Sequence, residues 1–288
     1  MRSSNPVFSR RGFSRDTSGF AGFHAGYGPQ ANPYAQPQAG APYAQPQMGN
    51  PYAPPQMAPQ GVPPYAPPRA GVMTMDDVVT RTGITLGLVI VAAAVSWIAG
   101  LSLGVAVVAA LVAMVLALVQ SFKRRPSPAL IMAYAGFEGL FLGSLSNHIN
   151  QYVNGAAMQA VLGTLAVFAG VLFMYKARII RVNQRFTRFV MAAAIGFMLL
   201  MSVNLLFMVF GGGDGLGFRS GGLGILFGIA GIVLGACFLA LDFKQVEDGI
   251  AYGAPREESW LAAFGLTLTL VWIYLEFLRL VAILQGND

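Results

Sequence analysis

Three of the twelve acidic residues stand inside long apolar runs: Glu138, Asp242 and Glu276. A charged side chain at the centre of a bilayer costs about 2.5–3.5 kcal/mol even on the lenient insertion scale, so such residues usually face a bundle interior and mark the path of an ion, a proton or a substrate. Carboxylates can hold a hard cation such as Ca²⁺, and two that approach each other titrate as a coupled pair. These residues are therefore the candidate ion-pathway and pH-sensing site. Glu138 has no Lys or Arg within four residues, and an ion path and a packing role are equally open for it.

Helical geometry predicts that Asp242 and Glu276 face the interior of the bundle. At 100° per residue, Gly265 and Thr269 lie within about 20° of Glu276, which gives the last run a small and partly polar stripe. Small residues let neighbouring helices approach closely. A similar stripe lies within about 40° of Asp242. It consists of Gly224, Gly228, Gly231 and Gly235.

A purely structural role is the alternative for both residues. Asp242 is near enough to the end of its run to pair with Lys244 or Arg125. Glu276 has Arg279 one turn further along the same predicted helix, where an acid and a base form an ion pair. Arg279 and Lys244 are therefore candidate partners of the acidic site.

The composition predicts an integral membrane protein. The 288-residue chain is 55% hydrophobic and only 10% charged, whereas soluble domains carry about 25% charged residues. A helix needs about 20 apolar residues to cross the bilayer, and seven runs have about that length. They cover residues 78–99, 101–120, 129–147, 157–175, 189–210, 222–243 and 259–284. The fold class expected is an all-α integral membrane protein with seven transmembrane helices.

Residues 1–72 differ from the membrane domain, residues 73–288, in composition. Pro-Tyr-Ala recurs at Pro33, Pro42, Pro51 and Pro64, separated by Gln, Gly, Asn and Pro. Such a segment cannot bury enough apolar surface to offset the entropy of ordering it. We predict a disordered cytoplasmic tail that acts as a spacer, with a docking ligand for a partner as the alternative.

The basic residues predict the orientation of the chain. Lys and Arg are concentrated in the N-terminal segment and in the loops after the second, fourth and sixth runs, and this excess marks the cytoplasmic side. With the N-terminus in the cytoplasm, Arg219 and Arg279 are the exceptions among 18 basic residues. The net charge of +6 follows this pattern rather than a basic stripe with interleaved aromatics, so nucleic-acid binding is not expected. The lipid bilayer is the expected partner.

Three motifs resemble those of the Bax inhibitor-1 family, the transmembrane Bax-inhibitor-motif proteins. Leu-Asp-Phe-Lys-Gln-Val-Glu-Asp-Gly, at Leu241–Gly249, is similar to the sixth-helix motif of that family, and Ile273–Leu280 is similar to its last-helix motif. Glu138–Gly143 resembles its Gly-x-x-Leu-Gly stretch in the third span. The resemblance covers residues 78–286 and excludes the tail. The likeness is greatest to the bacterial branch, which carries a long Pro/Gly-rich N-terminus.

The resemblance implies a seven-helix fold with the last helix central, a pH-sensitive cation (Ca²⁺) leak and a place in the bacterial plasma (inner) membrane. Carried over, the two facing acids that share protons and close the path are Asp242 and Glu276, where Ca²⁺ would be held. This sequence departs from the family pattern in two respects. The last-helix acid is Glu rather than Asp, and the connection between the two acids is longer, with Gly253–Ser259 preceding Trp260.

Two classes of function therefore stand, a pH-gated cation channel or transporter and a non-conducting scaffold. The scaffold would bind membrane proteases or other membrane proteins, or regulate stress responses. An enzyme is not expected. Gly211–Asp214 formally matches the Gly-x-Gly-Asp signature of intramembrane aspartyl proteases, but it has no second membrane aspartate opposite it. No cofactor is expected, and the single cysteine, Cys237, excludes an intramolecular disulfide and a thiolate metal cluster.

Overall fold

The computed structural model describes residues 71–211 and 220–286, which contain seven helices. All seven are long and apolar enough to cross a membrane, which confirms the predicted class of multi-pass membrane protein. In chain order the helices are α1 (Met75–Ile98), α2 (Leu103–Phe122), α3 (Pro128–Tyr152), α4 (Ala156–Lys176), α5 (Gln184–Gly211), α6 (Gly221–Ala251) and α7 (Glu258–Gln285).

The largest difference from the predicted boundaries is at the end of α6. The apolar run ends near residue 243, but the helix continues to Ala251 and ends before Gly253, whose φ of +69° favours glycine. Lys244 forms an ion pair of 2.8 Å with Asp248 one turn later, and such pairs support a helix in a polar segment. The helix therefore extends about two turns beyond the end of the apolar run.

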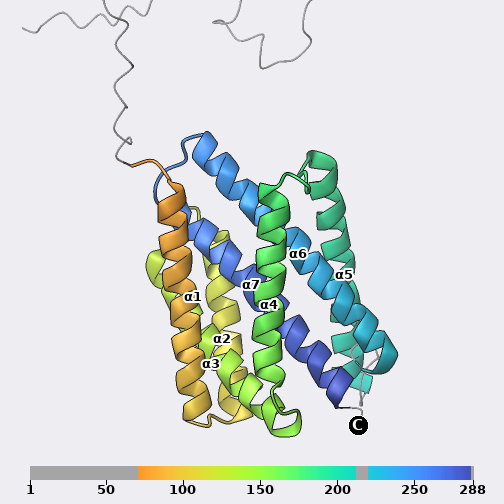
Figure 1. Ribbon diagram of the computed structural model, residues 1–288. Coiled ribbons are helices and arrows are strands. Elements are labelled where there is room, and N and C mark those ends of the chain that lie inside the picture. Colours follow the sequence, from red (N-terminus) through yellow and green to blue (C-terminus); the bar gives the residue numbers. More distant parts are fainter. Residues whose placement is uncertain (1–70, 212–219, 287–288) are drawn as a thin grey trace, which may run out of the picture. The chain divides into compact units, whose positions relative to one another are not determined.

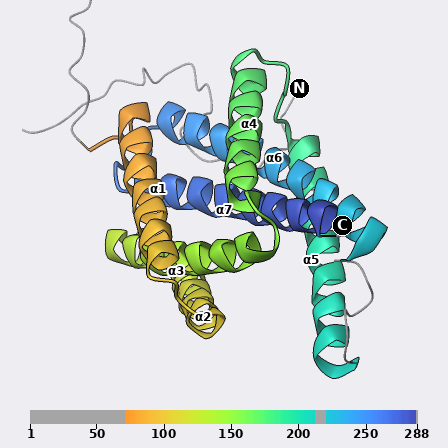
Figure 2. The ribbon, with the colours of Figure 1, turned by 60° about the horizontal axis from the view of Figure 1, so that its bottom comes forward.

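Helix α7 is central among the described helices, as the family resemblance implies. It packs against α1, α3, α4 and α6. Figure 1 shows it, in dark blue, crossing behind α4 between α1 and α6. In the turned view of Figure 2 it again runs through the middle of the helices. Side chains at the α7 surface therefore meet most of the bundle.

The helices around α7 form two groups. Helix α3 packs closely on α1 and α2, and Gly139 and Gly143 lie directly against the α1 backbone at Val89 and Ala93. Close approach of this kind requires small residues. On the other side of α7, helix α5 packs against α6. Ring contacts such as that between Phe197 and Trp272, with centroids 5.8 Å apart, also join α5 to α7.

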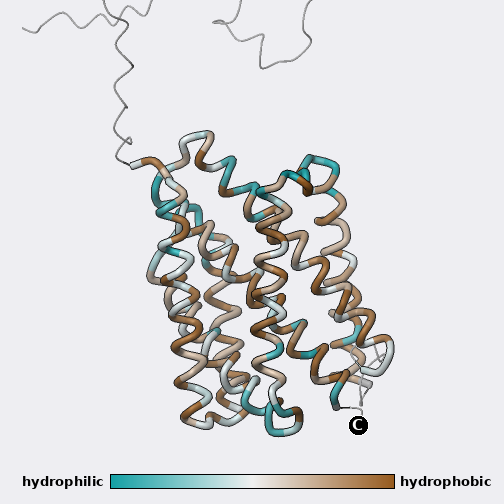
Figure 3. The backbone as a smooth tube through the Cα atoms, in the orientation of Figure 1, coloured by the Kyte–Doolittle hydropathy of each residue, from teal (hydrophilic) through white to brown (hydrophobic). Residues whose placement is uncertain are grey.

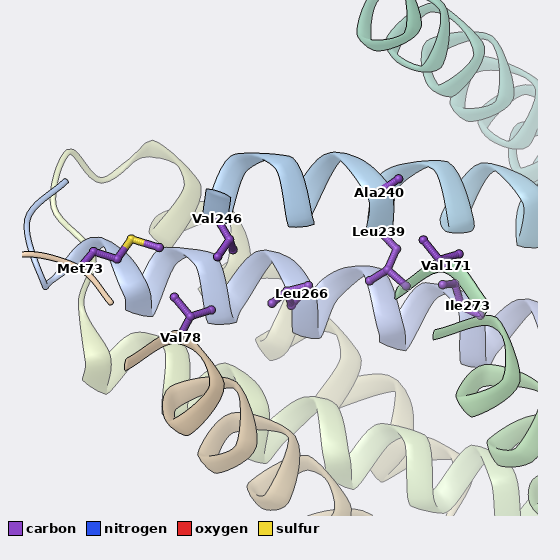
Figure 4. Packing of buried hydrophobic residues seen from close by; sticks show 8 residues of the cluster. All are labelled: Met73, Val78, Val171, Leu239, Ala240, Val246, Leu266 and Ile273. Atoms are coloured by element: carbon purple, nitrogen blue, oxygen red, sulfur yellow. The ribbon is translucent and has the colours of Figure 1, made fainter. Parts of the chain in front are cut away.

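The main buried cluster follows α7 along its contacts with α1, α4 and α6. Figure 4 shows Leu266 and Ile273 of α7 beside Leu239 of α6 and Val171 of α4. At one end of the cluster Met73, just before α1, reaches Val246. Hydrophobic residues dominate the helix bodies, whereas hydrophilic ones gather toward helix ends and loops, as expected for a protein solvated by lipid (Figure 3).

A short clasp joins the start of α1 to the loop between α6 and α7. The Met73 amide donates to the Ala254 carbonyl (2.8 Å), and the Arg256 amide donates to the Gly71 carbonyl (2.8 Å). The Arg256 guanidinium also forms an ion pair of 2.8 Å with Asp77 in the first turn of α1. The clasp is formed by the segment that lengthens the connection between Asp242 and Glu276, so this segment has a defined place in the fold.

Two expectations fall on residues that the structure does not describe. The predicted disordered tail, residues 1–72, lies almost entirely outside the described residues, as does most of the Gly211–Asp214 signature. Both stay predictions.

Candidate functional site

The predicted glycine stripe of α6 faces α7. A Cβ atom added to Gly235 would lie 2.6 Å from the Ile273 side chain, and one added to Gly231 would lie 2.8 Å from the Glu276 carboxyl carbon. Real Cβ atoms do not approach other atoms so closely, so the two helices can pack at this distance only because both positions lack a side chain. The stripe thus sets the position of α6 along α7.

Asp242 lies in the same interface, and we call Asp242, Thr269 and Gly265 the Asp242 site. The Thr269 hydroxyl donates a hydrogen bond of 2.6 Å to one carboxylate oxygen of Asp242. The other oxygen lies 3.5 Å from the place that a Cβ atom on Gly265 would take. Asp242 is half-buried, and its side-chain partner among the described residues is a neutral hydroxyl group.

Glu276 meets the glycine stripe further along, and we call Glu276, Arg279 and Gly231 the Glu276 site. The Arg279 guanidinium donates to the carboxylate and forms an ion pair with it, as the spacing of one turn predicts. Only 8% of Glu276 is exposed. In contrast to Asp242, this carboxylate is matched by a cation inside the bundle.

The structure does not bring Asp242 and Glu276 into contact. Glu276 is level with Gly231, which precedes Asp242 by 11 residues on α6, or about 16 Å at 1.5 Å per residue. Each acid lies nine residues before the end of its own helix, and consecutive spans run in opposite directions. The two acids therefore lie in opposite halves of the membrane along one helix–helix interface, and the facing pair implied by the resemblance is not formed.

Lys244 is not the partner of Asp242. It pairs instead with Asp248 (2.8 Å), which lies one turn later on the same face of α6. Asp242 is two positions from Lys244, and side chains at that spacing point in different directions. Among the described residues Asp242 forms no ion pair. The described part of the chain also contains no group of three or more His, Cys, Asp or Glu side chains placed to hold a metal ion. A cation at either site would meet one carboxylate at a time.

Glu138 is the third acid, and only 8% of it is exposed. It shares a face of α3 with Tyr134, whose ring packs edge-on against Phe264 of α7. Helices α3 and α7 run parallel, because Tyr134 meets Phe264 and Ser146, further along α3, bonds to Tyr274, further along α7. Glu138 is thus roughly level with the Asp242 site, on a different side of α7. Within the described residues its carboxylate has neither a hydrogen bond nor an ion pair.

The role of Thr269 was not predicted. Its place on the small stripe of the last helix was recognised, but the stripe was assigned to Glu276 rather than to Asp242. A pair of threonines lies near the same level, where the Thr85 and Thr267 hydroxyl groups, from α1 and α7, are 3.0 Å apart and buried. The signal in the sequence for this role is the presence of Thr267 and Thr269 in an apolar helix, because a hydroxyl group in hydrocarbon needs a hydrogen-bond partner.

Comparison with known proteins assigns the chain to a family. No curated protein matches it. The family model described as Bax inhibitor 1 like matches residues 5–286. The match begins at residue 5, so it also takes in the N-terminal segment that the motif resemblance excluded. The seven spanning helices, the central α7 and this match over almost the whole sequence agree, and the chain belongs to the Bax inhibitor 1 like family.

Proposed function

We propose that this membrane protein forms a pH-sensitive pathway for a cation such as Ca²⁺, with Asp242, Glu276 and Glu138 as the acidic groups along it. We also propose the bacterial plasma membrane as its location, on the resemblance to the bacterial branch. No enzymatic reaction is part of the proposal.

The observation that supports the proposal best is the contrast between Asp242, an acidic residue, and its uncharged partner. Its carboxylate lies within a spanning helix pair, and the partner it has is the neutral Thr269 hydroxyl. A negative charge without a cation in a low-dielectric region is stabilised when a proton or a cation binds to it. Protons and Ca²⁺ would therefore compete for this group, and flux would fall as the pH falls.

Glu276 would play a different part in the same path. The Arg279 guanidinium already neutralises it, so a cation reaching Glu276 must displace the guanidinium or overcome its repulsion. The Glu276 site is thus the barrier of the pathway and the Asp242 site its proton-sensitive entry. Glu138, level with Asp242, adds negative potential at that depth.

The test compares Ca²⁺ flux into vesicles that contain the full-length chain and an internal Ca²⁺ indicator, from acidic to neutral pH. Asp242→Asn is expected to remove the pH dependence of the flux, because the amide keeps the size of the side chain but cannot bind a proton. Asp248→Asn is the matched control. It makes the same change on the same helix, at a half-exposed residue that pairs with Lys244.

An Asp242→Asn variant with the flux and pH response of the unmodified chain would overturn the proposal. An unmodified chain without measurable flux would do the same and would leave a membrane scaffold as the function.

A further inference from the structure

A groove lies on the opposite side of α7 from α6. It has a volume of about 620 Å³, within the range of ligand-binding pockets. Helices α3 and α7 form its floor and α1 and α4 its two walls. Among the described helices, α1 and α4 do not pack against each other, and Figure 1 shows α7 behind the space between them. The groove therefore opens sideways, toward the lipid.

The groove is apolar along most of its length and has polar groups toward one end. Its walls run along α1 from Leu86 to Trp97, which is 11 residues or about 16 Å. This is about half of the 30 Å thickness of the hydrocarbon layer, or one leaflet. Trp97 is in the last turn of α1, so this end of the groove lies where the helix leaves the membrane.

The polar groups include a hydroxyl pair on the floor. The Ser146 and Tyr274 hydroxyl oxygens are 2.6 Å apart, and either can be the donor. Each hydroxyl carries one proton, and the pair uses only one of the two. Neither residue has another side-chain hydrogen bond within the described part of the chain, so one O–H group is left to donate to an acceptor in the groove.

We propose that the groove binds one acyl chain of a membrane phospholipid, with an ester oxygen of the lipid accepting a hydrogen bond from the Ser146–Tyr274 pair. Four features of the groove fit such a lipid. The groove has the length of one leaflet, its walls are apolar, it opens toward the bilayer, and a hydrogen-bond donor lies near its outer end. The site is separate from the two carboxylate sites and does not depend on the proposed function.

Photo-crosslinking can test the site because its floor is buried. The full-length chain is reconstituted in vesicles containing phosphatidylcholine with a diazirine in one acyl chain, illuminated, and digested for mass spectrometry. Only a chain inside the groove can reach Val271, of which 7% is exposed, whereas Val108 on α2, with 61% exposed, lies outside the groove and is open to any surrounding lipid. Label on Val271 or its neighbour Leu270 is the expected result.

Variants that fill the groove are expected to lose this label. Ala94→Phe on α1 and Ala157→Phe on α4 each place a ring in the groove from a different wall, so one serves if the other does not fold. Ala133→Phe is the matched control, since it fills a shallower groove of about 380 Å³ between α1 and α3. The double variant Ser146→Ala/Tyr274→Phe is expected to weaken the label, because it removes both hydroxyl groups, whereas Tyr274→Phe alone leaves the Ser146 hydroxyl free to donate.

Label confined to outward-facing residues such as Val108 would overturn the proposal, as would equal Val271 label in the filled variants. A parallel sample with a diazirine-bearing free fatty acid separates the two sources of an acyl chain. Floor label from the fatty acid but none from the phospholipid would overturn the assignment to phospholipid. Unchanged label in Ser146→Ala/Tyr274→Phe would overturn the hydrogen bond to the ester.

Discussion

The Asp242 site and the Glu276 site lie on one interface between the same two helices, yet they treat a carboxylate in opposite ways. Thr269 gives Asp242 a neutral donor, and Gly265 leaves space beside it. Arg279 gives Glu276 a full positive charge, and the Gly231 backbone lies tightly against it. Within the described part of the chain, one acid thus has space beside it and no cation, whereas the other is tightly packed and paired with a cation.

This difference indicates that burial alone does not define a functional acid. A buried ion pair such as that of Glu276 and Arg279 is a structural element once both partners are in place, and removing one partner is what destabilises the protein. A carboxylate without a cation retains the capacity to exchange protons or cations. Of the two acids, Asp242 is therefore the better candidate for exchange and Glu276 for a structural barrier.

The largest expected effect is on stability and comes from Glu276→Gln. It removes the negative partner of Arg279 inside the bundle and should lower the free energy of unfolding by about 3–5 kcal/mol. Asp242→Asn should lower it far less, because Thr269 can donate to an amide oxygen as well. Unfolding by denaturant in detergent micelles measures both. Equal losses would contradict the distinction, and the double variant Glu276→Gln/Arg279→Gln should recover part of the loss.

A smaller loss is expected when Thr269 is replaced by Val. The change keeps the shape of the side chain but removes the donor to Asp242, which should cost about 1.5–3 kcal/mol, as for other hydrogen bonds to charged groups. Thr269→Ser keeps a hydroxyl and is the control. If Thr269→Val proves as stable as Thr269→Ser, the hydrogen bond does not hold Asp242 in place.

Alanine substitution at the two glycines measures how tight each site is. Gly231→Ala would place a Cβ atom 2.8 Å from the Glu276 carboxyl carbon, and overpacking of this kind costs about 1–3 kcal/mol. Gly265→Ala would place one 3.5 Å from an Asp242 oxygen, which is ordinary contact distance, and should be nearly neutral. Thermal unfolding of the two variants checks the contrast. A larger loss for Gly265→Ala would reverse it.

The smallest effect is expected from Arg256→Gln, which removes an ion pair outside the carboxylate sites. Arg256 pairs with Asp77, but 62% of its side chain is exposed, whereas 13% of the Arg279 side chain is. Exposed pairs contribute about 0.2–1 kcal/mol, and salt screens them. Unfolding at low and high salt should show a small loss that disappears with salt. A loss as large as that of Glu276→Gln would show that the clasp is a major support of the bundle.

The sequence was sufficient to predict the spans and the faces of the helices, but not their relative depth. Hydropathy locates the apolar runs, and the period of a helix aligns Gly228, Gly231 and Gly235 with Asp242, so the packed face could be predicted. Depth depends on how far each helix continues beyond its apolar run. Lys244 suggested that α6 ends near residue 243, whereas the helix continues to Ala251.

The register between α6 and α7 was unpredictable for a related reason. It is set by which side chain fits against which glycine, as Glu276 fits against Gly231. Such complementarity is a property of two surfaces in contact, and neither helix contains it alone. The partner of Glu276 could be predicted because Arg279 is on the same helix, whereas the partner of Asp242 comes from another helix.

The clasp at the start of α1 has a consequence for how the protein is made. Arg256 and Asp77 are 179 positions apart in the chain, and the segment that carries Arg256 directly precedes the last helix. Synthesis proceeds from the N-terminus, so the first helix enters the membrane long before its partner leaves the ribosome. Closure of the clasp is thus one of the final steps of assembly. A chain truncated after α6 would lack it and would expose Met73, which makes this edge a point where quality control could distinguish finished from unfinished molecules.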